Sequence, residues 1–412
     1  MNLLILTNLY PPQELGGYGR SMADFAWGLR QRGHKIHVLS SDTPHLGPST
    51  DMGTSGETIE RNLVLKGSYE GGIRPITERD MIDTINEANA DFINRAWERH
   101  GPFDGVIAGN IDLLGLEVIN ELLRKGVTVL HHIGFINPPY HPKEQPKSWD
   151  YKLVAASNAV GRSLQQAGLH YKSEKGNSEE IPVVYPGVRA DLFGKATTQR
   201  RLPEPLDGRN KDKKLGTKRR PLRVCFAGLL MGSKGVHTLV QAVVLLKKQG
   251  LIIEGYLAGG TFQKGYREKL EKLLYENGVE GVMFTGQLSR ACLARFFSLH
   301  HVCVFPSIHP EAFGIVGAEA MASGLTLVSS GVGGASELFI DNESGLKFNP
   351  GDANDLANKL KYLCENPKRL CELAEAGQAK AIKKLNVMET TKGLEYIIKK
   401  REGRQKSNII FF

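Results

Sequence analysis

Short apolar runs alternate with segments of helical spacing along almost the whole chain, in two series. Unbroken runs of Val, Ile and Leu are typical of strands buried on both faces of a parallel sheet, and their alternation with helices indicates βαβ units. Residues 43–72, which are rich in Gly, Ser, Thr and Pro, interrupt the first series and contain one strand-like run at 63–65. The sequence therefore predicts an α/β protein with two doubly wound parallel sheets. The expected strands lie at 3–6, 36–39, 105–108, 127–130, 153–156 and 181–185 in the first series, and at 224–227, 255–258, 282–285, 302–305 and 325–329 in the second.

A polar, basic segment separates the two series. A chain of 412 residues exceeds one ordinary core, so two domains are expected. Residues 195–220 carry ten basic and three acidic side chains and almost no apolar ones, and such a run cannot bury enough surface to fold alone. We therefore expect a Rossmann-like domain at 1–194, a flexible linker at 195–220, a second Rossmann-like domain at 221–390, and a helix and tail at 391–412. The cleft between the two domains is the expected place for a ligand.

The net charge of +9 is concentrated in two segments. Residues 195–220 carry +7 and residues 378–412 carry +6, so the rest of the chain is slightly negative and offers no general basic surface to a nucleic acid. The five cysteines form no CxxC pair, which favours free thiols in a reducing compartment. The start of the chain lacks a secretory pattern, and no apolar run approaches the length of a membrane span. We expect a cytoplasmic protein, with peripheral contact to anionic lipid through the basic segments left open.

The stretch 302–324, VCVFPSIHPEAFGIVGAEAMASG, predicts a strand, a loop and a helix in that order. Glu311 lies in the loop, Glu319 lies in the helix, and Gly314 stands between them near the helix start. The free amides at a helix start suit a phosphate, whereas carboxylates accept strong hydrogen bonds from sugar hydroxyls. This combination predicts a nucleotide-sugar site.

Three further features follow expected strands, where ligands bind in open parallel sheets. Gly16 and Gly17 lie in a GGYG loop after the first strand, and Lys234 lies on a glycine-bearing turn after the strand at 224–227. The glycines allow a close backbone approach, and the lysine supplies a cation for a diphosphate. His131 and His132 end the strand at 127–130, where we expect them to face the cleft.

These motifs, taken in order, resemble the large retaining, glycogen-synthase-like glycosyltransferase family, family 4 in the usual numbering, which has the GT-B fold of two facing Rossmann-like domains. The resemblance covers nearly the whole chain. Its matching segments are GGYGR, RGHKIHVLS, the turn at Ser157 and YPGVRADLF in the first half, and FAGLLMGSKGVHTLVQA, FTGQL, FPSIHPEAFGIVGAEAMASG, GVGGASELF and ESGLKFNPGD in the second.

The resemblance implies transfer of a sugar, with retention, from a nucleoside-diphosphate-sugar donor to a hydroxyl acceptor. The first domain takes the acceptor and the second the donor, whose nucleotide is UDP or GDP, and the last helix crosses back to the first domain. Glu311 lies against the donor sugar, Glu319 holds the ribose hydroxyls, and Lys234 neutralises the leaving group. His132 lies near the sugar and acceptor, with His131 as the alternative. The implied donor-binding residues are Glu319, Gly314, Ile315, Val316, Gly16, Gly17, Gly228 and Leu288.

The sequence departs from the family pattern at one position. Many relatives have an arginine in the phosphate clamp where this chain has Leu229, and Arg20 in the glycine loop is a candidate to compensate. The chain has no DxD sequence, which would supply two carboxylates to a divalent cation. We therefore expect no metal and no other cofactor.

Several alternatives stay open at this point. A nicotinamide-dependent enzyme would use the glycines at 16, 17 and 19 with Asp42, but the loop lacks the third glycine of the dinucleotide fingerprint. A non-catalytic nucleotide-sugar-binding protein of the same fold would explain Leu229. An epimerase or synthase relative, and nucleic-acid binding through the linker, are the remaining candidates.

Overall fold

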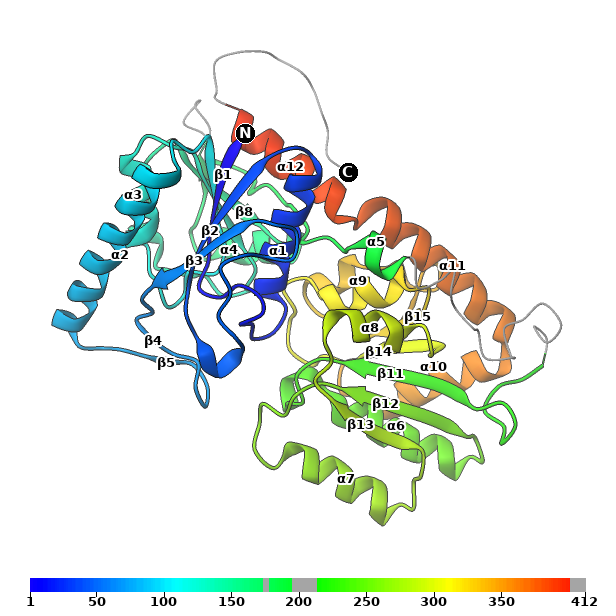
Figure 1. Ribbon diagram of the computed structural model, residues 1–412. Coiled ribbons are helices and arrows are strands. Elements are labelled where there is room, and N and C mark those ends of the chain that lie inside the picture. Colours follow the sequence, from blue (N-terminus) through cyan, green and yellow to red (C-terminus); the bar gives the residue numbers. More distant parts are fainter. Residues whose placement is uncertain (173–177, 195–212, 401–412) are drawn as a thin grey trace.

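A computed structural model describes residues 1–172, 178–194 and 213–400 of the chain. Two α/β domains lie next to each other, and the last helix, α12, lies on the first domain although it follows the second in sequence (Figure 1). Most of the expected linker, residues 195–212, and the expected tail, residues 401–412, lie outside the described residues.

The first domain is built on six parallel strands in the order β3-β2-β1-β6-β7-β8. The side chains of β1 alternate between two cores: Leu3 and Ile5 face α1 and α12, while Leu4 and Leu6 face α2, α3 and α4. The strands are β1 (Asn2–Leu6), β2 (Lys35–Ser41), β3 (Thr58–Leu63), β6 (Gly105–Ala108), β7 (Val129–Ile133) and β8 (Tyr151–Ala155). The helices are α1 (Tyr18–Gln31), α2 (Arg79–His100), α3 (Glu117–Arg124), α4 (Asn158–Gln166) and α12 (Val387–Lys399).

The second domain repeats this plan, with parallel strands in the order β13-β12-β11-β14-β15-β16. Val224 and Phe226 of β11 face α6, α7 and α10, whereas Cys225 and Ala227 face α8 and α9. The strands are β11 (Leu222–Ala227), β12 (Ile253–Ala258), β13 (Val282–Gly286), β14 (Val302–Phe305), β15 (Thr326–Ser329) and β16 (Leu346–Lys347). The helices are α6 (Val236–Lys248), α7 (Tyr266–Glu276), α8 (Arg290–Phe297), α9 (Ile315–Ala322), α10 (Ala353–Glu365) and α11 (Pro367–Lys384).

Both sheets confirm the predicted fold class, because each is parallel and wound in two directions from its central strand. The order reverses between β1 and β6 in the first sheet and between β11 and β14 in the second. Loops that follow these four strands therefore gather at the topological switch points, where such sheets bind ligands. Among the described residues, the other strands are β4 (Gly67–Ser68), β5 (Arg74–Pro75), β9 (Tyr171–Lys172) and β10 (Ser178–Glu179), and the other α-helix is α5 (Ala190–Phe193).

Two sequence expectations about strands are wrong. The polar segment TIERNL forms the edge strand β3, which pairs with β2, whereas a strand was expected only at 63–65. Residues 181–185 form no strand but a single bridge between Val183 and Ala155. Pro182 lacks an amide hydrogen for a ladder, which explains the shortened pairing. Among the described residues, no helix is both long and apolar enough to cross a bilayer.

Candidate active site

The turn after β11 and the loop after β14 bring a lysine and a glutamate together. Lys234 ends a short 3-10 helix, Gly232–Lys234, and its Nζ donates to Glu311 Oε1 at 2.6 Å. The hydroxyl of Ser307 donates to the same carboxylate oxygen. Both side chains of the ion pair are only partly buried, so a ligand can reach them. The turn and loop thus place one cation and one carboxylate at the switch point of the second sheet.

Helix α9 begins beside this ion pair. Its N-cap, Gly314, has a φ of +98°, which side chains rarely adopt, and no side chain of the described chain caps the helix. The first amides of a helix have no carbonyl partner within it, so those of Ile315 and Val316 are available to an anion. The start of α9 therefore offers hydrogen-bond donors next to Lys234.

The glycine loop of the first domain meets the start of α9. Gly17 precedes α1, and a Cβ atom added to it would lie 2.9 Å from Ile315 Cγ2, which is too close for real carbon atoms. Gly16, beside it, has a left-handed φ of +72°. The absence of a side chain at Gly17 thus lets a loop of one domain lie directly against the helix start of the other.

Glu319 lies one turn further along α9 and has no exposed surface (0%). Its Oε1 accepts a hydrogen bond from Arg290 Nη2 at 3.2 Å, and its Oε2 is buried without a partner among the described residues. Burial raises the pKa of this carboxyl, whereas the positive charges of Arg20 and Arg290 oppose the rise. The helix that starts at the proposed phosphate contact thus also carries a carboxylate with one oxygen free to accept.

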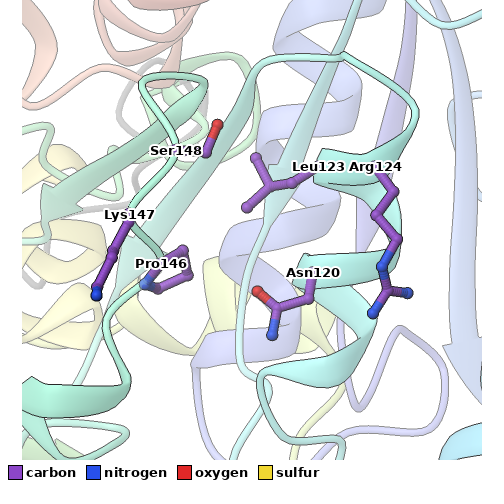
Figure 2. Close-up of a pocket in the computed structure, with 6 residues that line it drawn as sticks. All are labelled: Asn120, Leu123, Arg124, Pro146, Lys147 and Ser148. Carbon is purple, nitrogen blue, oxygen red and sulfur yellow. The ribbon is translucent and has the colours of Figure 1, made fainter.

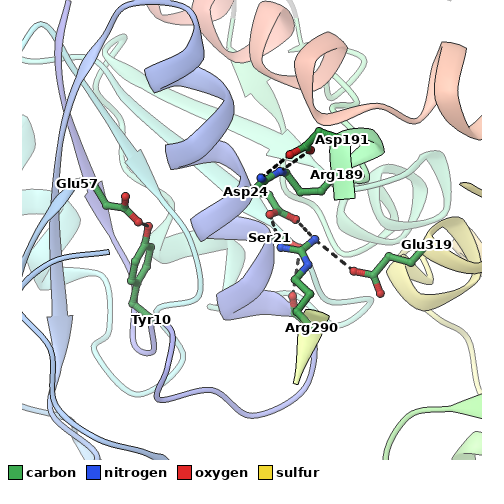
Figure 3. A network of polar contacts seen from close by, with 9 residues as sticks. Tyr10, Ser21, Asp24, Glu57, Arg189, Asp191, Arg290 and Glu319 are labelled. Atoms are coloured by element: carbon green, nitrogen blue, oxygen red, sulfur yellow. Dashed lines mark hydrogen bonds and ion pairs between the residues drawn. The ribbon is translucent and has the colours of Figure 1, made fainter. Parts of the chain in front are cut away.

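Arg290 was not anticipated from the sequence. It is the first residue of α8, and both of its terminal nitrogens donate hydrogen bonds to the Asp24 carboxylate of α1 (Figure 3). One of these nitrogens also donates to Glu319, so Arg290 connects the two domains. The signal that could have found it is its place directly after the FTGQLS segment. Its partner Asp24 lies 266 residues away, on the helix that follows the glycine loop.

Comparison with known proteins identifies the kind of enzyme. Residues 207–380 match the family described as Glycosyl transferases group 1. The chain is a glycosyltransferase, and its second domain contains the group 1 segment. The D-inositol 3-phosphate glycosyltransferase of Streptomyces scabiei is 27% identical over 393 residues, which cover 89% of this chain and 83% of that protein. The glycogen synthase of Mycobacterium tuberculosis is 28% identical over an alignment that covers 98% of this chain and 96% of that protein. The nicotinamide alternative finds no support in these matches.

Solved structures share the fold of this glycosyltransferase. A glycosyltransferase from Rickettsia africae superposes with a TM-score of 0.73 at 19% identity, over 97% of this chain and 98% of that one. The Anabaena protein HepE, solved in complex with UDP and glucose, gives a TM-score of 0.68 at 19% identity, over 97% of this chain and 99% of that one. Both are similar in the two-domain architecture.

The glycosyltransferase does not expose the histidines that the sequence placed at the cleft. His132 has no exposed surface (0%), its Nε2 lies 2.8 Å from the carbonyl oxygen of Val184, and its ring packs edge-on against Phe25 of α1. Burial lowers the pKa of His132 to about 4 and that of His131, which contacts Tyr151, to about 3. Both rings are neutral at pH 7 and buried, His132 beneath Phe25 of α1, whereas the sequence led us to expect exposed rings; a role of His132 beside the sugar stays a prediction.

The other predicted donor residues lie around the same loops. Gly228 directly follows β11, and the next residue, Leu229, has a partly buried aliphatic side chain. Leu288 lies just before α8 and packs against the core of the α8 and α9 face. Arg20 lies in the first turn of α1, near enough to Glu14 and Glu319 to oppose the rise in the pKa of both carboxyls.

Two hollows open in the first domain of the glycosyltransferase. One, of about 390 Å³, lies between α3 and the loop before β8, with Arg124 and Lys147 at its walls (Figure 2). The other, of about 450 Å³, lies where β2 and β3 end and is lined by Asp42, Arg61 and Tyr69 among others. Neither contains a residue that the sequence assigned to the donor.

One group among the described residues has metal-ligand chemistry. His37, Glu60 and His100 place their ligand atoms within 4.8 Å of one another, near the amino ends of the first-domain strands. Both Glu60 oxygens already accept hydrogen bonds or ion pairs, from the two histidines and from Arg99. The three residues therefore form a cluster in which the Glu60 carboxylate is already paired. The cluster lies near the amino ends of the strands, whereas the glycine loop follows the carboxyl end of β1.

Proposed function

We propose that this glycosyltransferase moves a hexose-type sugar from a UDP- or GDP-sugar to a hydroxyl acceptor with retention of anomeric configuration. The Lys234–Glu311 ion pair at 2.6 Å, beside the start of α9, carries the proposal. It combines a cation and amide donors, which suit a diphosphate, with a carboxylate, which suits a sugar. The UDP and glucose bound by HepE, a protein of the same fold, support a nucleotide-sugar donor.

In this proposal each group has one task. Lys234 and the amides of Ile315 and Val316 stabilise the charge that develops on the leaving diphosphate. Glu311 accepts hydrogen bonds from the donor sugar and holds the anomeric carbon toward the acceptor. Gly16 and Gly17 close the site from the first domain, while Gly228 and Leu288 line the nucleotide side. His132 packs beneath α1 and supports the fold of the acceptor side.

Glu319 would bind the nucleotide through its ribose. A vicinal diol has two hydroxyl donors, and Glu319 presents Oε2 together with the second lone pair of Oε1. A charged acceptor that gains neutral donors in a buried site forms strong hydrogen bonds. This geometry supports an ordinary ribonucleotide donor.

We place the acceptor in the 450 Å³ hollow at the ends of β2 and β3. Its walls include carboxylate and phenol groups, from Asp42 and Tyr69, which suit a polyhydroxylated molecule. Relatives are named D-inositol 3-phosphate glycosyltransferase and glycogen synthase, and inositol phosphate and glycogen are both polyhydroxylated, which agrees with such an acceptor.

We further propose that the reaction takes place in the cytoplasm and needs no metal. Free cysteines, four of them wholly or partly buried, suit a reducing compartment. Lys234 and the α9 amides supply the positive field that a divalent cation would otherwise provide. A donor assay with and without EDTA tests the second statement, since a loss of activity restored by Mg²⁺ or Mn²⁺ would contradict it.

The proposed function is tested by following nucleoside diphosphate release from UDP- and GDP-sugars with a panel of polyol acceptors. Glu311→Ala should abolish transfer with little change in melting temperature, and Glu319→Ala should mainly weaken nucleotide binding. Glu271→Ala removes a surface carboxylate that pairs with Arg267 on α7 and serves as the matched control. The anomeric proton coupling of the product reports retention. Full activity of Glu311→Ala, or an inverted product, would refute the assignment.

A further inference from the structure

We propose that Arg290 is a positioning residue through which Asp24, in the first domain, sets the affinity of Glu319, in the second domain, for the nucleotide. The inference rests on the proposed function, because it takes the nucleotide ribose as the partner of Glu319. It adds a residue of the acceptor-side domain that controls donor binding without touching the donor.

The three side chains form a chain of contacts across the domain interface (Figure 3). Arg290 Nη2 lies 2.6 Å from Asp24 Oδ2, and Nη1 donates to the other oxygen of the same carboxylate. The same Nη2 lies 3.2 Å from Glu319 Oε1. The Asp24 side chain is 1% exposed and that of Glu319 is 0% exposed, so water screens these charges little. Such a planar two-pronged contact fixes the guanidinium in orientation as well as in position.

The cluster around these residues contains four buried polar atoms without partners among the described residues. They are Oε2 of Glu319, Oε2 of Glu14, Nε of Arg20 and Nε of Arg290. Buried polar groups are normally satisfied, and each one left unpaired costs free energy. An acceptor oxygen on Glu319, aimed away from Arg290, calls for a hydroxyl donor. The cluster is therefore organised for a polar ligand rather than as a closed structural ion pair.

Arg290 controls whether Glu319 can accept from such a ligand. Burial and the carboxylate of Asp24 favour the protonated form of Glu319, while the charges of Arg20 and Arg290 favour the ionised form. Glu14 is a further carboxyl in the same cluster, and burial raises its pKa as well. A protonated Glu319 would offer one oxygen as a donor and would lose one acceptor for the ribose. Holding Arg290 in place therefore keeps both Glu319 oxygens as acceptors.

Asp24 is what holds Arg290 in place. Without the Asp24 carboxylate the guanidinium keeps one hydrogen bond to Glu319 and is free to rotate about its side chain. Asp24 and Arg290 lie on different domains. The packing of the two domains against each other is therefore coupled to the affinity of the Glu319 carboxylate for the ribose. Linkage is reciprocal, so a bound nucleotide also stabilises the docking of α1 against α8.

The test is calorimetric titration of the full-length chain with UDP and with GDP at pH 7.5. Asp24→Asn and Arg290→Gln should each weaken the nucleotide that wild type binds by at least about fivefold, the low end of common coupling between sites. Arg290→Lys should be intermediate, because lysine keeps the charge but loses the fork. Arg223→Gln, which removes an arginine paired with Glu254 elsewhere in the second domain, is the matched control and should bind like wild type.

The double variant Asp24→Asn with Arg290→Gln separates positioning from folding. It leaves two neutral side chains facing each other, so it avoids an unpaired buried charge and should fold even if a single variant does not. Its affinity should be no lower than that of Arg290→Gln alone, because Asp24 favours nucleotide binding only through Arg290, whereas its own negative charge disfavours the ionised Glu319. A further loss on adding Asp24→Asn to Arg290→Gln would overturn the proposal, since Asp24 would then act by another route.

A pH series gives a readout that a purely structural role would not move. The ratio of the dissociation constants of Arg290→Gln and wild type should shrink between pH 6 and pH 8.5, because Glu319 in the variant ionises as pH rises. The ratio cancels the titration of the nucleotide itself. If wild type binds UDP or GDP and Asp24→Asn binds the same nucleotide equally well, this inference is overturned and the proposed function is not. Wild type that binds neither nucleotide would refute the proposed function and the inference with it.

Discussion

A single methyl group at Gly17 should separate the two halves of the site. The backbone of Gly17 has a φ of −96° and a ψ of −12°, which alanine adopts without strain, so Gly17→Ala acts only through its Cβ. That atom would lie 2.9 Å from Ile315 Cγ2, whereas carbon atoms normally approach to about 3.5–4.0 Å. Ile315 is β-branched and sits in the first turn of α9, so its side chain has few other rotamers. The loop and the helix must therefore move apart by several tenths of an ångström.

Overpacking of this kind typically costs about 1–3 kcal/mol. If that cost falls on the contact between the glycine loop and α9, kcat/KM should fall about 5- to 150-fold, since about 1.4 kcal/mol corresponds to a factor of ten. The melting temperature should change little, because neither domain core is touched. Nucleoside diphosphate release measures the rate for wild type, Gly17→Ala, Ile315→Ala and the double variant. Ile315→Ala removes Cγ2, so the double variant should recover to within about threefold of Ile315→Ala alone. A double variant as slow as Gly17→Ala, or a fully active Gly17→Ala, would refute the reasoning.

Two further predictions concern the first domain. The pKa of His132 falls from its usual value near 6.5 to about 4 on folding, because burial disfavours the charged ring. Below pH 6.5 the unfolded chain therefore takes up a proton that the folded chain does not. Urea denaturation should show that the free energy of unfolding of wild type drops by about 2 kcal/mol more between pH 7 and pH 5 than that of His132→Gln. Equal drops in the free energy of unfolding of the two proteins would contradict the burial of His132. Leu394 of α12 is fully buried beside Leu3, Ile5 and Phe25, so Leu394→Ala should lower the free energy of unfolding by about 2–5 kcal/mol, whereas the exposed Ile382→Ala on α11 should change it little. Equal effects of the two alanine substitutions would show that α12 does not stabilise the first domain.

The sequence allowed the two sheets to be predicted, because a strand buried on both faces is a local apolar run. The edge strand β3 escaped this rule, since its apolar residues Ile59 and Leu63 alternate with polar ones. Arg61 is buried between them, and its guanidinium donates to the carbonyl oxygens of Tyr10 and Pro11. A buried arginine satisfied by distant backbone carbonyls leaves no periodic signal.

The site divides in the same way. Lys234, Glu311 and Glu319 could be singled out because each lies in a short motif whose chemistry is local. The contact of Arg290 with Asp24 depends on how two domains dock, and their positions 266 residues apart carry no such information. The burial of His132 was missed for the opposite reason. The end of a strand looks open in sequence, whereas Phe25 of α1 and the chain at Val184 cover it in the folded protein.

The distribution of charge explains how the site can work without an arginine at position 229. The guanidinium of Arg290 is committed to Asp24 and Glu319, and the turn after β11 supplies another cation, Lys234, which pairs with Glu311. A nucleotide sugar carries both an anion that suits Lys234 and hydroxyls that suit Glu311. When the donor separates Lys234 from Glu311, its diphosphate can therefore pair with the lysine and its hydroxyls can donate to the glutamate, so neither charge is left unpaired. Lys234 lies in the turn after β11 and Glu311 in the loop after β14. In the proposed reaction this exchange of partners would therefore take place at the switch point of the second sheet, where the first amides of α9 add to the field of the lysine.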